Sequence, residues 1–423
     1  MTPSLPGPHL TIHRCAHEIG GNCIEIVASD GSRILLDAGR PLWAARDADL
    51  QTLVPATLDT AKPTLAVLIS HPHLDHWGLL GALPATWPVW TGPASCELIR
   101  ASAAMDRRPI RQALHAWQSG KPTQIGPFTV TPRLVDHSAF DAYMLQIDVD
   151  GRRLLYTGDF RRHGRKRALV DRLMDQPPAN VDVLLTEGTN LGRDRPILTE
   201  EQLSWQFVHL FRRTSGRVFV AWSAQNVDRT VTLYRACLRA KRTLVVDLYT
   251  AQMMHLMAPF ARLPVPGPDY PNLKVLVTSK LAKRCRILGQ GDVLDSWQAQ
   301  CGVTPTELAR NPRQFVVAVR HGLLTDYTAI GVQPRLGDSW SFSLWRGYLD
   351  QPHGRTVTAW FDAAGAHAEH LHTSGHATHA DLRAFAAAIA AKRVVPIHGD
   401  QWDDPAFALP RQVRVGDGDK FVL

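Results

Sequence analysis

The sequence is poor in cysteine and contains no long hydrophobic run. Six cysteines occur in 423 residues with no C-x-x-C pair, and a disulfide scaffold of this length would need a secretory signal, of which the N-terminal residues show no sign. No stretch of about 18 consecutive apolar residues is present, so neither a membrane-spanning helix nor a membrane partner is predicted. We therefore expect a cytoplasmic protein whose cysteines serve as small hydrophobic side chains.

The sequence also lacks the excess charge and low hydrophobicity of a disordered chain. Hydrophobic residues make up 45% of it and charged residues 20%, which is an ordinary globular balance. At this length, two compact units are expected. The net charge of +8 favours a polyanionic partner, although it is a weak indication alone, because many basic proteins bind no nucleic acid.

Strand and helix patterns change near residue 200. The part of the chain before residue 160 is rich in strand signals. From Thr199, which forms a capping-box pair with Gln202, helices and strands alternate, as is typical of an α/β unit with a largely parallel sheet. Closer to the end of the chain, the pattern predicts a strand at Val357–Phe361 and a helix at His379–Ala391.

The strongest feature is the segment Ser70-His71-Pro72-His73-Leu74-Asp75-His76, which follows a short apolar run. Imidazole nitrogens and carboxylate oxygens are the ligands that zinc and similar divalent metals accept. At the end of a strand, His71 and His73 can share one ion, while Asp75 and His76 turn toward a second. The alternative is a solvated loop that contains histidines by chance, and four ligands at this spacing argue against it.

This segment resembles the H-x-H-x-D-H signature of the metallo-β-lactamase superfamily. The resemblance implies an α/β fold, the αββα sandwich, with two divalent metal ions at one edge; zinc is the first choice and manganese the alternative. Further ligands are expected after strands along the chain. By resemblance, the first metal is held by His71, His73 and His137, the second by Asp75, His76 and His398, both by Asp159, and Asp37 orients the metal-binding histidines.

The long interval between Asp159 and His398 resembles the β-CASP branch of this superfamily, in which a second α/β domain is inserted into the hydrolase. We therefore expect the hydrolase domain at 1–200 and 346–423 and the inserted β-CASP domain at 201–345. The motifs of the branch are matched at Glu187, His376 and His398.

The segment around His376 also has a physical reason to bind an anion. A glycine-containing turn that leads into a helix offers backbone N–H groups and a positive dipole end to phosphate. The alternative is a plain helix cap beside scattered histidines. The residues predicted to bind the phosphate of the substrate are His372, Ser374, Gly375 and His376.

The resemblance implies a nuclease, most similar to the RNase J family, which it also resembles in the segment Glu-Ile-Gly-Gly-Asn at Glu18–Asn22. A histidine at position 398 favours RNA, because DNA-repair members of the branch typically carry valine there. We expect a ribonuclease, endonucleolytic, 5′-exonucleolytic or both, that cuts single-stranded RNA with a hydroxide bridging two metals. The catalytic candidates are Asp75 and Asp37, which orient the hydroxide or its ligands, His376, which binds the scissile phosphate and protonates the leaving oxygen, and Glu187, which supports the site.

Other functions stay open at this point. A DNA nuclease of the same branch is the first alternative, and a small-molecule ester, thioester or lactone hydrolase is the second, since the metal motif is shared with such enzymes. A non-catalytic scaffold is the third, although all seven candidate ligands are present. The basic run Arg161–Arg167 is either a solvated edge or a track for the nucleic-acid backbone.

Overall fold

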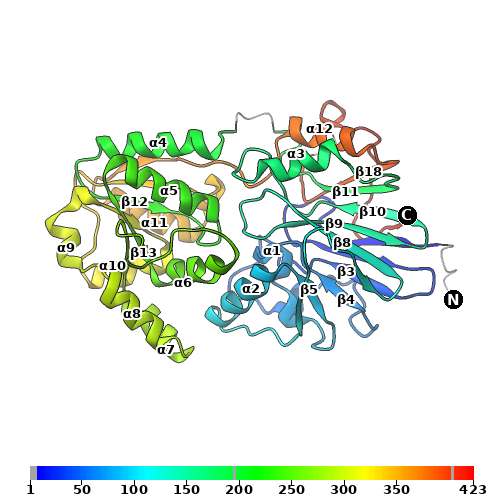
Figure 1. Ribbon diagram of the computed structural model, residues 1–423, viewed down its shortest axis with the longest axis horizontal. Coiled ribbons are helices and arrows are strands. Elements are labelled where there is room, and N and C mark those ends of the chain that lie inside the picture. The colour runs from blue at the N-terminus through cyan, green and yellow to red at the C-terminus, as the bar shows by residue number, and fades with distance from the viewer. Residues whose placement is uncertain (1–6, 194–196, 402–403) are drawn as a thin grey trace. The chain divides into compact units, whose positions relative to one another are not determined.

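The protein, described here by a computed structural model over residues 7–193, 197–401 and 404–423, divides into two compact units (Figure 1). The first unit combines residues 1–196 with 375–423, and the second contains residues 197–374. The second unit extends beyond the predicted border at 345 because β17 (His367–Glu369) pairs with β16 (Ser339–Phe342) in its sheet. The domain borders 1–200, 201–345 and 346–423 stay a prediction, since compactness alone does not define a domain.

Two β-sheets form the centre of the first unit. The first sheet has the strand order β19-β1-β2-β3-β4-β5-β6 and the second β18-β11-β10-β9-β8-β7. The late strands β18 and β19 return to the edges of sheets built by the first part of the chain. The strands of the first sheet are β1 (His9–Arg14), β2 (Cys23–Val27), β3 (Arg33–Leu36), β4 (Ala66–Leu68), β5 (Val89–Thr91), β6 (Leu114–Ala116) and β19 (Lys420–Val422). Those of the second sheet are β7 (Thr123–Ile125), β8 (Phe128–Leu134), β9 (Tyr143–Val149), β10 (Arg152–Tyr156), β11 (Val183–Glu187) and β18 (Arg393–Ile397).

Alternating side chains explain why both faces of each sheet are covered. Successive strand residues point to opposite faces. Accordingly, Leu36 and Leu154 join the apolar core that the two sheets share, whereas Leu35 and Leu155 face outward, each into a helix-covered core. The predicted αββα sandwich is thereby confirmed. The helices on the outer side of the first sheet are α1 (Leu74–Trp77) and α2 (Pro93–Met105), and those on the second are α3 (Arg167–Asp175) and α12 (His379–Ile389).

The second unit is built on one parallel sheet with helices on both faces, as the alternation of helices and strands predicted. Its strand order is β14-β13-β15-β12-β16-β17, and one apolar core lies on each face. Among the described residues, no helix is both long and apolar enough to cross a membrane. The further strands are β12 (Val218–Ala221), β13 (Thr243–Asp247), β14 (Leu273–Leu276) and β15 (Phe315–Ala318), and the helices are α4 (Glu200–Arg213), α5 (Val227–Ala240), α6 (Leu248–Met257), α7 (Ser279–Ile287), α8 (Gly291–Cys301), α9 (Pro305–Arg310), α10 (Leu324–Ala329) and α11 (Pro352–Asp362).

One local prediction is wrong and two are confirmed. Val357–Phe361 was expected to form a strand, but it lies inside α11, which begins with Pro352 in its first turn. Val357 and Phe361 are four residues apart, so a helix buries both on one side, against the core that contains Trp340. The helix predicted from His379 is present as α12. All six cysteines are buried and unpaired with one another, as expected of small hydrophobic residues.

Candidate metal centre

The predicted metal ligands lie just beyond the ends of strands in the first unit. His71 follows β4, His137 follows β8 and Asp159 follows β10. His73 is the residue before α1, and Asp75 and His76 lie inside it. His398 directly follows β18 with a φ of 52°. Strand ends that meet at one edge of the sandwich bring side chains from positions 71 to 398 together.

The carboxylate of Asp159 is the centre of this arrangement. It is buried, and its Oδ2 atom lies 3.2 Å from His76 Nε2 and 3.7 Å from His71 Nε2. The same oxygen is 3.8 Å from His398 Nε2 and 4.0 Å from His137 Nε2. A single carboxylate oxygen therefore faces imidazole nitrogens from both predicted metal sets, which is the placement expected of a bridging ligand.

Four groups of three donor atoms have the spacing of metal ligands, with the atoms of each group within 4.8 Å of one another. Two of these groups match the two predicted ligand sets, and two others contain Asp159. No predicted ligand lies outside them. The groups are His71, His73 and His137; His71, His76 and Asp159; Asp75, His76 and His398; and Asp159, His376 and His398.

The buried donor atoms at the centre fit a cation better than they fit one another. Asp159 Oδ1 and His398 Nε2 have no hydrogen-bond partner among the described residues, although both are buried. His73 Nδ1 lies 3.1 Å from His71 Nε2 and 3.2 Å from His137 Nε2. Three ring nitrogens that converge in this way cannot all be satisfied by shared protons, whereas a divalent cation would accept all three lone pairs.

Burial keeps most of these histidines in the neutral form that binds metals. Burial, followed by the neighbouring imidazoles, holds the pKa of His71 and of His137 well below the usual value. Burial also lowers the pKa of His73 to about 4 and lowers that of His398. His76 is the exception: burial alone would lower its pKa, but the carboxylates of Asp159 and Asp37 outweigh it and raise the pKa.

Asp37 orients His76 through the ring nitrogen that faces away from Asp159. It lies just after β3 in the left-handed region (φ 56°) and is fully buried. His76 Nδ1 lies 2.7 Å from Asp37 Oδ2, so an Nδ1–H donates to the carboxylate and leaves Nε2 free to face Asp159. Ser70 donates to both carboxylate oxygens through its backbone N–H and its hydroxyl, and the Tyr156 hydroxyl donates to Oδ2 at 2.5 Å.

Asn22 plays the same part for His398 and was not singled out as a site residue from the sequence. Its Oδ1 atom lies 2.6 Å from His398 Nδ1, and its Nδ2 donates to the Tyr156 hydroxyl at 3.0 Å. The side-chain amide is therefore fixed with its oxygen toward the histidine, which directs His398 Nε2 into the cluster. The only sequence signal was its place in the segment Glu18–Asn22, which resembles RNase J.

His376 lies at the exposed side of the cluster, beside Glu187. Its Nδ1 atom is 3.3 Å from Glu187 Oε2 and 3.7 Å from Asp159 Oδ2. Burial alone would lower the pKa of His376, but the carboxylates of Glu187 and then Asp159 raise it to about 9. Glu187 is itself fixed by the backbone N–H groups of Thr189 and Ala377. The pair thus presents a protonated imidazole next to the predicted metals.

The remaining predicted phosphate-binding residues are placed differently from one another. Gly375 belongs to the first unit, and its carbonyl oxygen lies 2.6 Å from His137 Nδ1, so it fixes a predicted ligand. A Cβ at this position would come within 2.6 Å of Ser138 Oγ, which explains the glycine. His372 and Ser374 belong to the second unit, and their predicted contact with phosphate stays a prediction.

The basic run 161–167 is largely occupied by acidic partners within the first unit. Arg161 is fully buried beside Asp136. Arg162 pairs with Asp171 at 2.7 Å and with Asp381 at 3.0 Å. A uniformly solvated edge is therefore wrong for the start of this run, and these two arginines stabilise the fold around α3.

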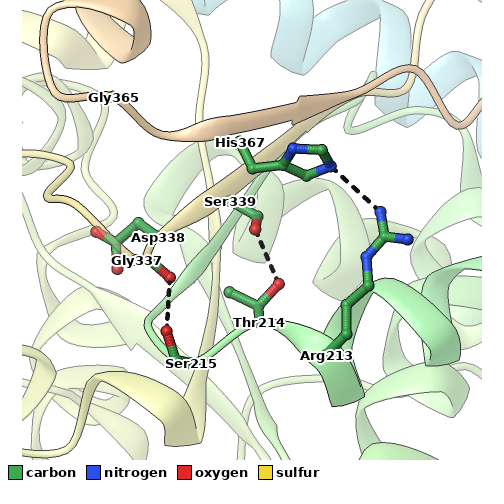
Figure 2. A pocket seen from close by; sticks show the side chains of 8 residues that line it. All are labelled: Arg213, Thr214, Ser215, Gly337, Asp338, Ser339, Gly365 and His367. Atoms are coloured by element: carbon green, nitrogen blue, oxygen red, sulfur yellow. Dashed lines mark hydrogen bonds between the residues drawn. The ribbon is translucent and has the colours of Figure 1, made fainter.

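An open cavity of about 430 Å³ lies in the second unit (Figure 2). Its polar side chains face one another: the Thr214 hydroxyl donates to Ser339, Ser215 donates to the Gly337 carbonyl, and Arg213 points toward His367. Arg213 also pairs with Glu369. None of the residues predicted to act in catalysis or metal binding lines this cavity, which is lined by Arg213, Thr214, Ser215, Gly337, Asp338, Ser339, Gly365 and His367.

Comparison with known families agrees with this geometry. A family model described as the beta-lactamase superfamily domain matches residues 32–245, about half of the chain. The chain belongs to the metallo-β-lactamase superfamily. A second model, the Zn-dependent metallo-hydrolase RNA specificity domain, matches residues 365–408 and so includes Gly375, His376 and His398. Family and cluster together indicate a metallo-hydrolase that binds divalent metal.

Individual relatives place the chain within this superfamily. Ribonuclease J of Helicobacter pylori (strain B128) is 22% identical over 408 residues, covering 90% of this chain and 54% of that protein. An RNase J-like protein of Methanocaldococcus jannaschii is 25% identical over 190 residues, covering 43% of this chain and 42% of that one. The chain thus spans about half the length of the curated relatives it matches. The chain is thus similar to RNase J proteins over 90% of its length.

A solved structure supports the fold over nearly the whole chain. The crystal structure of a protein of unknown function from Enterococcus faecalis V583 superposes with a TM-score of 0.79 at 20% sequence identity. The match covers 98% of this chain and 100% of that one. The two proteins therefore share their fold although only 20% of their aligned residues are identical.

Proposed function

We propose that this metallo-β-lactamase superfamily member is a ribonuclease that depends on two divalent metal ions, zinc first and manganese as the alternative. The observation that carries the proposal is the Asp159 carboxylate, which faces histidines of two separate donor groups. Its second oxygen is buried and has no partner in residues 7–193, 197–401 and 404–423. Two ions about 3.5–4 Å apart are the usual apparatus for phosphodiester hydrolysis. When bound, such ions neutralise charge at phosphorus and lower the pKa of the attacking water.

Some residues are assigned to hold the metal ions, and others orient the side chains that hold them. The first ion is assigned to His71, His73 and His137, and the second to Asp75, His76 and His398, with Asp159 shared. Asp37, Asn22 and the Gly375 carbonyl fix the outer ring nitrogens of His76, His398 and His137. Each imidazole is thereby held in the tautomer and direction that present its inner nitrogen to a metal.

His376 is assigned to the substrate. Held protonated beside Glu187, its imidazolium can donate a hydrogen bond to a phosphate oxygen and deliver a proton to the leaving oxygen. Glu187 positions this ring and stabilises its charge. Asp75, half-buried at the second donor group, is assigned to ligation and to orienting the attacking water.

RNA is the proposed substrate class for three reasons. The RNA specificity domain model matches residues 365–408, several curated relatives are named Ribonuclease J, and the net charge of the chain is +8, which suits a polyanion. A single-stranded substrate is favoured because the bases of a single strand are unpaired and open to contact with protein side chains.

Metal-free protein reloaded with zinc or manganese should cut RNA, and this assay tests the proposal. The substrates are one sequence prepared as 5′-phosphate RNA, 5′-triphosphate RNA, circular RNA and single-stranded DNA. Cutting of the circle would establish endonuclease activity, and release of mononucleotides from 5′-phosphate RNA alone would establish a 5′-exonuclease. Preference for the DNA, or hydrolysis of a lactone or thioester but not of RNA, would reject the proposal.

A further inference from the structure

Three large apolar side chains are exposed beside the predicted second metal group. Leu42 is 43% exposed, Trp43 is 68% exposed and Leu74 is 45% exposed. Single exposed apolar residues need no explanation, but these come from two separate segments, 40–43 and the start of α1, which are joined by a hydrogen bond from the Arg40 backbone N–H to the Leu74 carbonyl at 3.0 Å. We call Pro41, Leu42, Trp43 and Leu74 together the apolar rim.

The apolar rim lies directly against a predicted metal ligand. Pro41 pairs with Gly20 in a β-bridge. A Cβ at Gly20 would meet Leu42 Cγ at 2.7 Å and Asp75 Oδ2 at 3.1 Å, so only glycine allows this approach. The segment that ends in Trp43 is thus held next to the carboxylate of Asp75, within the first unit.

The indole ring of Trp43 is restrained although it is exposed. Its Nε1–H donates to Glu18 Oε2 at 3.1 Å, and Glu18 is in turn 3.6 Å from the guanidinium of Arg14. The only polar group of the indole is therefore engaged by the protein, while 68% of the residue's surface is open to solvent. An aromatic face presented in this way is suited to stacking on a planar, apolar partner.

We propose that Trp43 is the platform on which a nucleobase next to the scissile phosphate stacks. The inference rests on the proposed ribonuclease function and adds the means by which a single strand is positioned at the cluster. Every base has a π face, so such stacking binds unpaired nucleotides with little sequence preference. A base paired within a duplex has no free face, so the platform also selects for single strands.

The first test compares cleavage kinetics of the metal-loaded full chain with three variants. Trp43→Ala and Trp43→Leu should raise the KM for single-stranded RNA about 10-fold with kcat changed less than about twofold, whereas Trp43→Phe should stay close to the parent. Leu retains an apolar side chain without a π face, so it separates stacking from general hydrophobic contact and covers the case in which alanine disturbs the fold.

The matched control is Trp205→Ala. Trp205 is 47% exposed, belongs to the second unit and packs against the guanidinium of Arg239 at 4.6 Å. Its removal should leave KM unchanged. An equal rise of KM in Trp205→Ala and Trp43→Ala would overturn the assignment, because it would show a general effect of losing an exposed tryptophan.

The second test identifies the stacked base. A set of RNAs is prepared in which a single abasic residue occupies successive positions on either side of the cleavage site. At one position next to that site, the abasic residue should raise KM about 10-fold in the parent and have no further effect in Trp43→Ala. Additive effects at every position, or an unchanged KM in Trp43→Ala, would overturn the inference alone. Failure of the parent to cut any RNA would instead overturn the proposed function, and the platform with it.

Discussion

Two buried acids, one in each unit, show how a ligand differs from a structural charge. Glu200 in the second unit is 1% exposed, and its oxygens accept hydrogen bonds from Arg229 Nη2 at 3.3 Å and Thr232 Oγ1 at 2.8 Å. Asp159 in the first unit is 2% exposed, faces several imidazoles with one oxygen and has no partner for the other within the described part of the chain. Burial is the same in both, but only Glu200 has a direct protein partner for each oxygen.

This difference in pairing indicates which of the two buried carboxylates needs a bound ligand to complete its interactions. A buried ion with all its partners inside the protein is compensated and contributes to the fold. A buried ion with an open lone pair costs free energy unless a ligand completes it. The fully paired acid therefore belongs to the core of the second unit, and the incompletely paired one is the proposed metal ligand.

Substituting Asp159→Asn should have the largest effect. Bound metal should be lost and RNA cleavage should fall to the level of a metal-free blank, because this carboxylate faces histidines of both predicted metal sets. Metal analysis and cleavage rates measure the loss. Metal at about 100 times its Kd should raise the unfolding free energy of the parent by about 2.7 kcal/mol and that of the variant not at all. A variant with parental metal content and rate would contradict the bridging role.

Glu200→Gln should show the reverse pattern. It leaves the buried guanidinium of Arg229 without its counter-charge, which should lower the unfolding free energy by about 3–5 kcal/mol. Metal content and metal affinity should not change, since Glu200 belongs to the second unit. Denaturant unfolding and metal analysis measure the two effects. If Glu200→Gln lost metal but kept its stability, Glu200 would not be a purely structural acid, and the contrast with Asp159 would be wrong.

Asp37→Asn tests a residue that orients a predicted metal ligand, His76, without being a predicted ligand itself. The amide keeps the shape of the side chain but weakens the hold on His76 Nδ1, so metal affinity should fall about 10–100-fold. Competition with a chelator measures the affinity. Asp141→Asn is the matched control: Asp141 is a buried acid of the same unit that contacts Tyr143 and Ser95, and its substitution should leave the affinity at the parental value.

At neutral pH, the smallest effect is expected at His372, a half-buried imidazole of the second unit. Burial, followed by the charge of Arg229, lowers its pKa to about 3, whereas histidine in an unfolded chain titrates near 6.5. Only the unfolded state gains a proton between these values, so stability is intact above pH 6.5 and falls toward pH 3, by about 1 kcal/mol per pH unit. His372→Gln should remove this contribution.

The unfolding free energies of the parent and of His372→Gln are measured by denaturant unfolding of the metal-free proteins at several pH values. The curves of stability against pH should converge as the pH falls if His372 resists protonation in the folded protein. Parallel curves would show that His372 does not contribute to the acid sensitivity.

The sequence by itself determined the fold class and the order of the candidate ligands. Alternation of side chains along strands such as β3 and β10 is a local property, and it places one face of each strand in the core between the sheets. The candidate ligands were found because the adjacent residues His71, His73, Asp75 and His76 resemble a known metal motif, and the resemblance directed the search for the later ones after strands. Spacing of this kind is visible without coordinates.

Tertiary structure alone decided what fixes those ligands. Asn22 and His398 are 376 positions apart, and the Gly375 carbonyl meets His137 across 238 positions; no local pattern encodes such pairs. The same reason explains the wrong strand at Val357–Phe361, where burial against Trp340 overrode the β preference of the residues. Local sequence sets periodicity and ligand type, whereas the direction of each side chain depends on partners that only folding brings near.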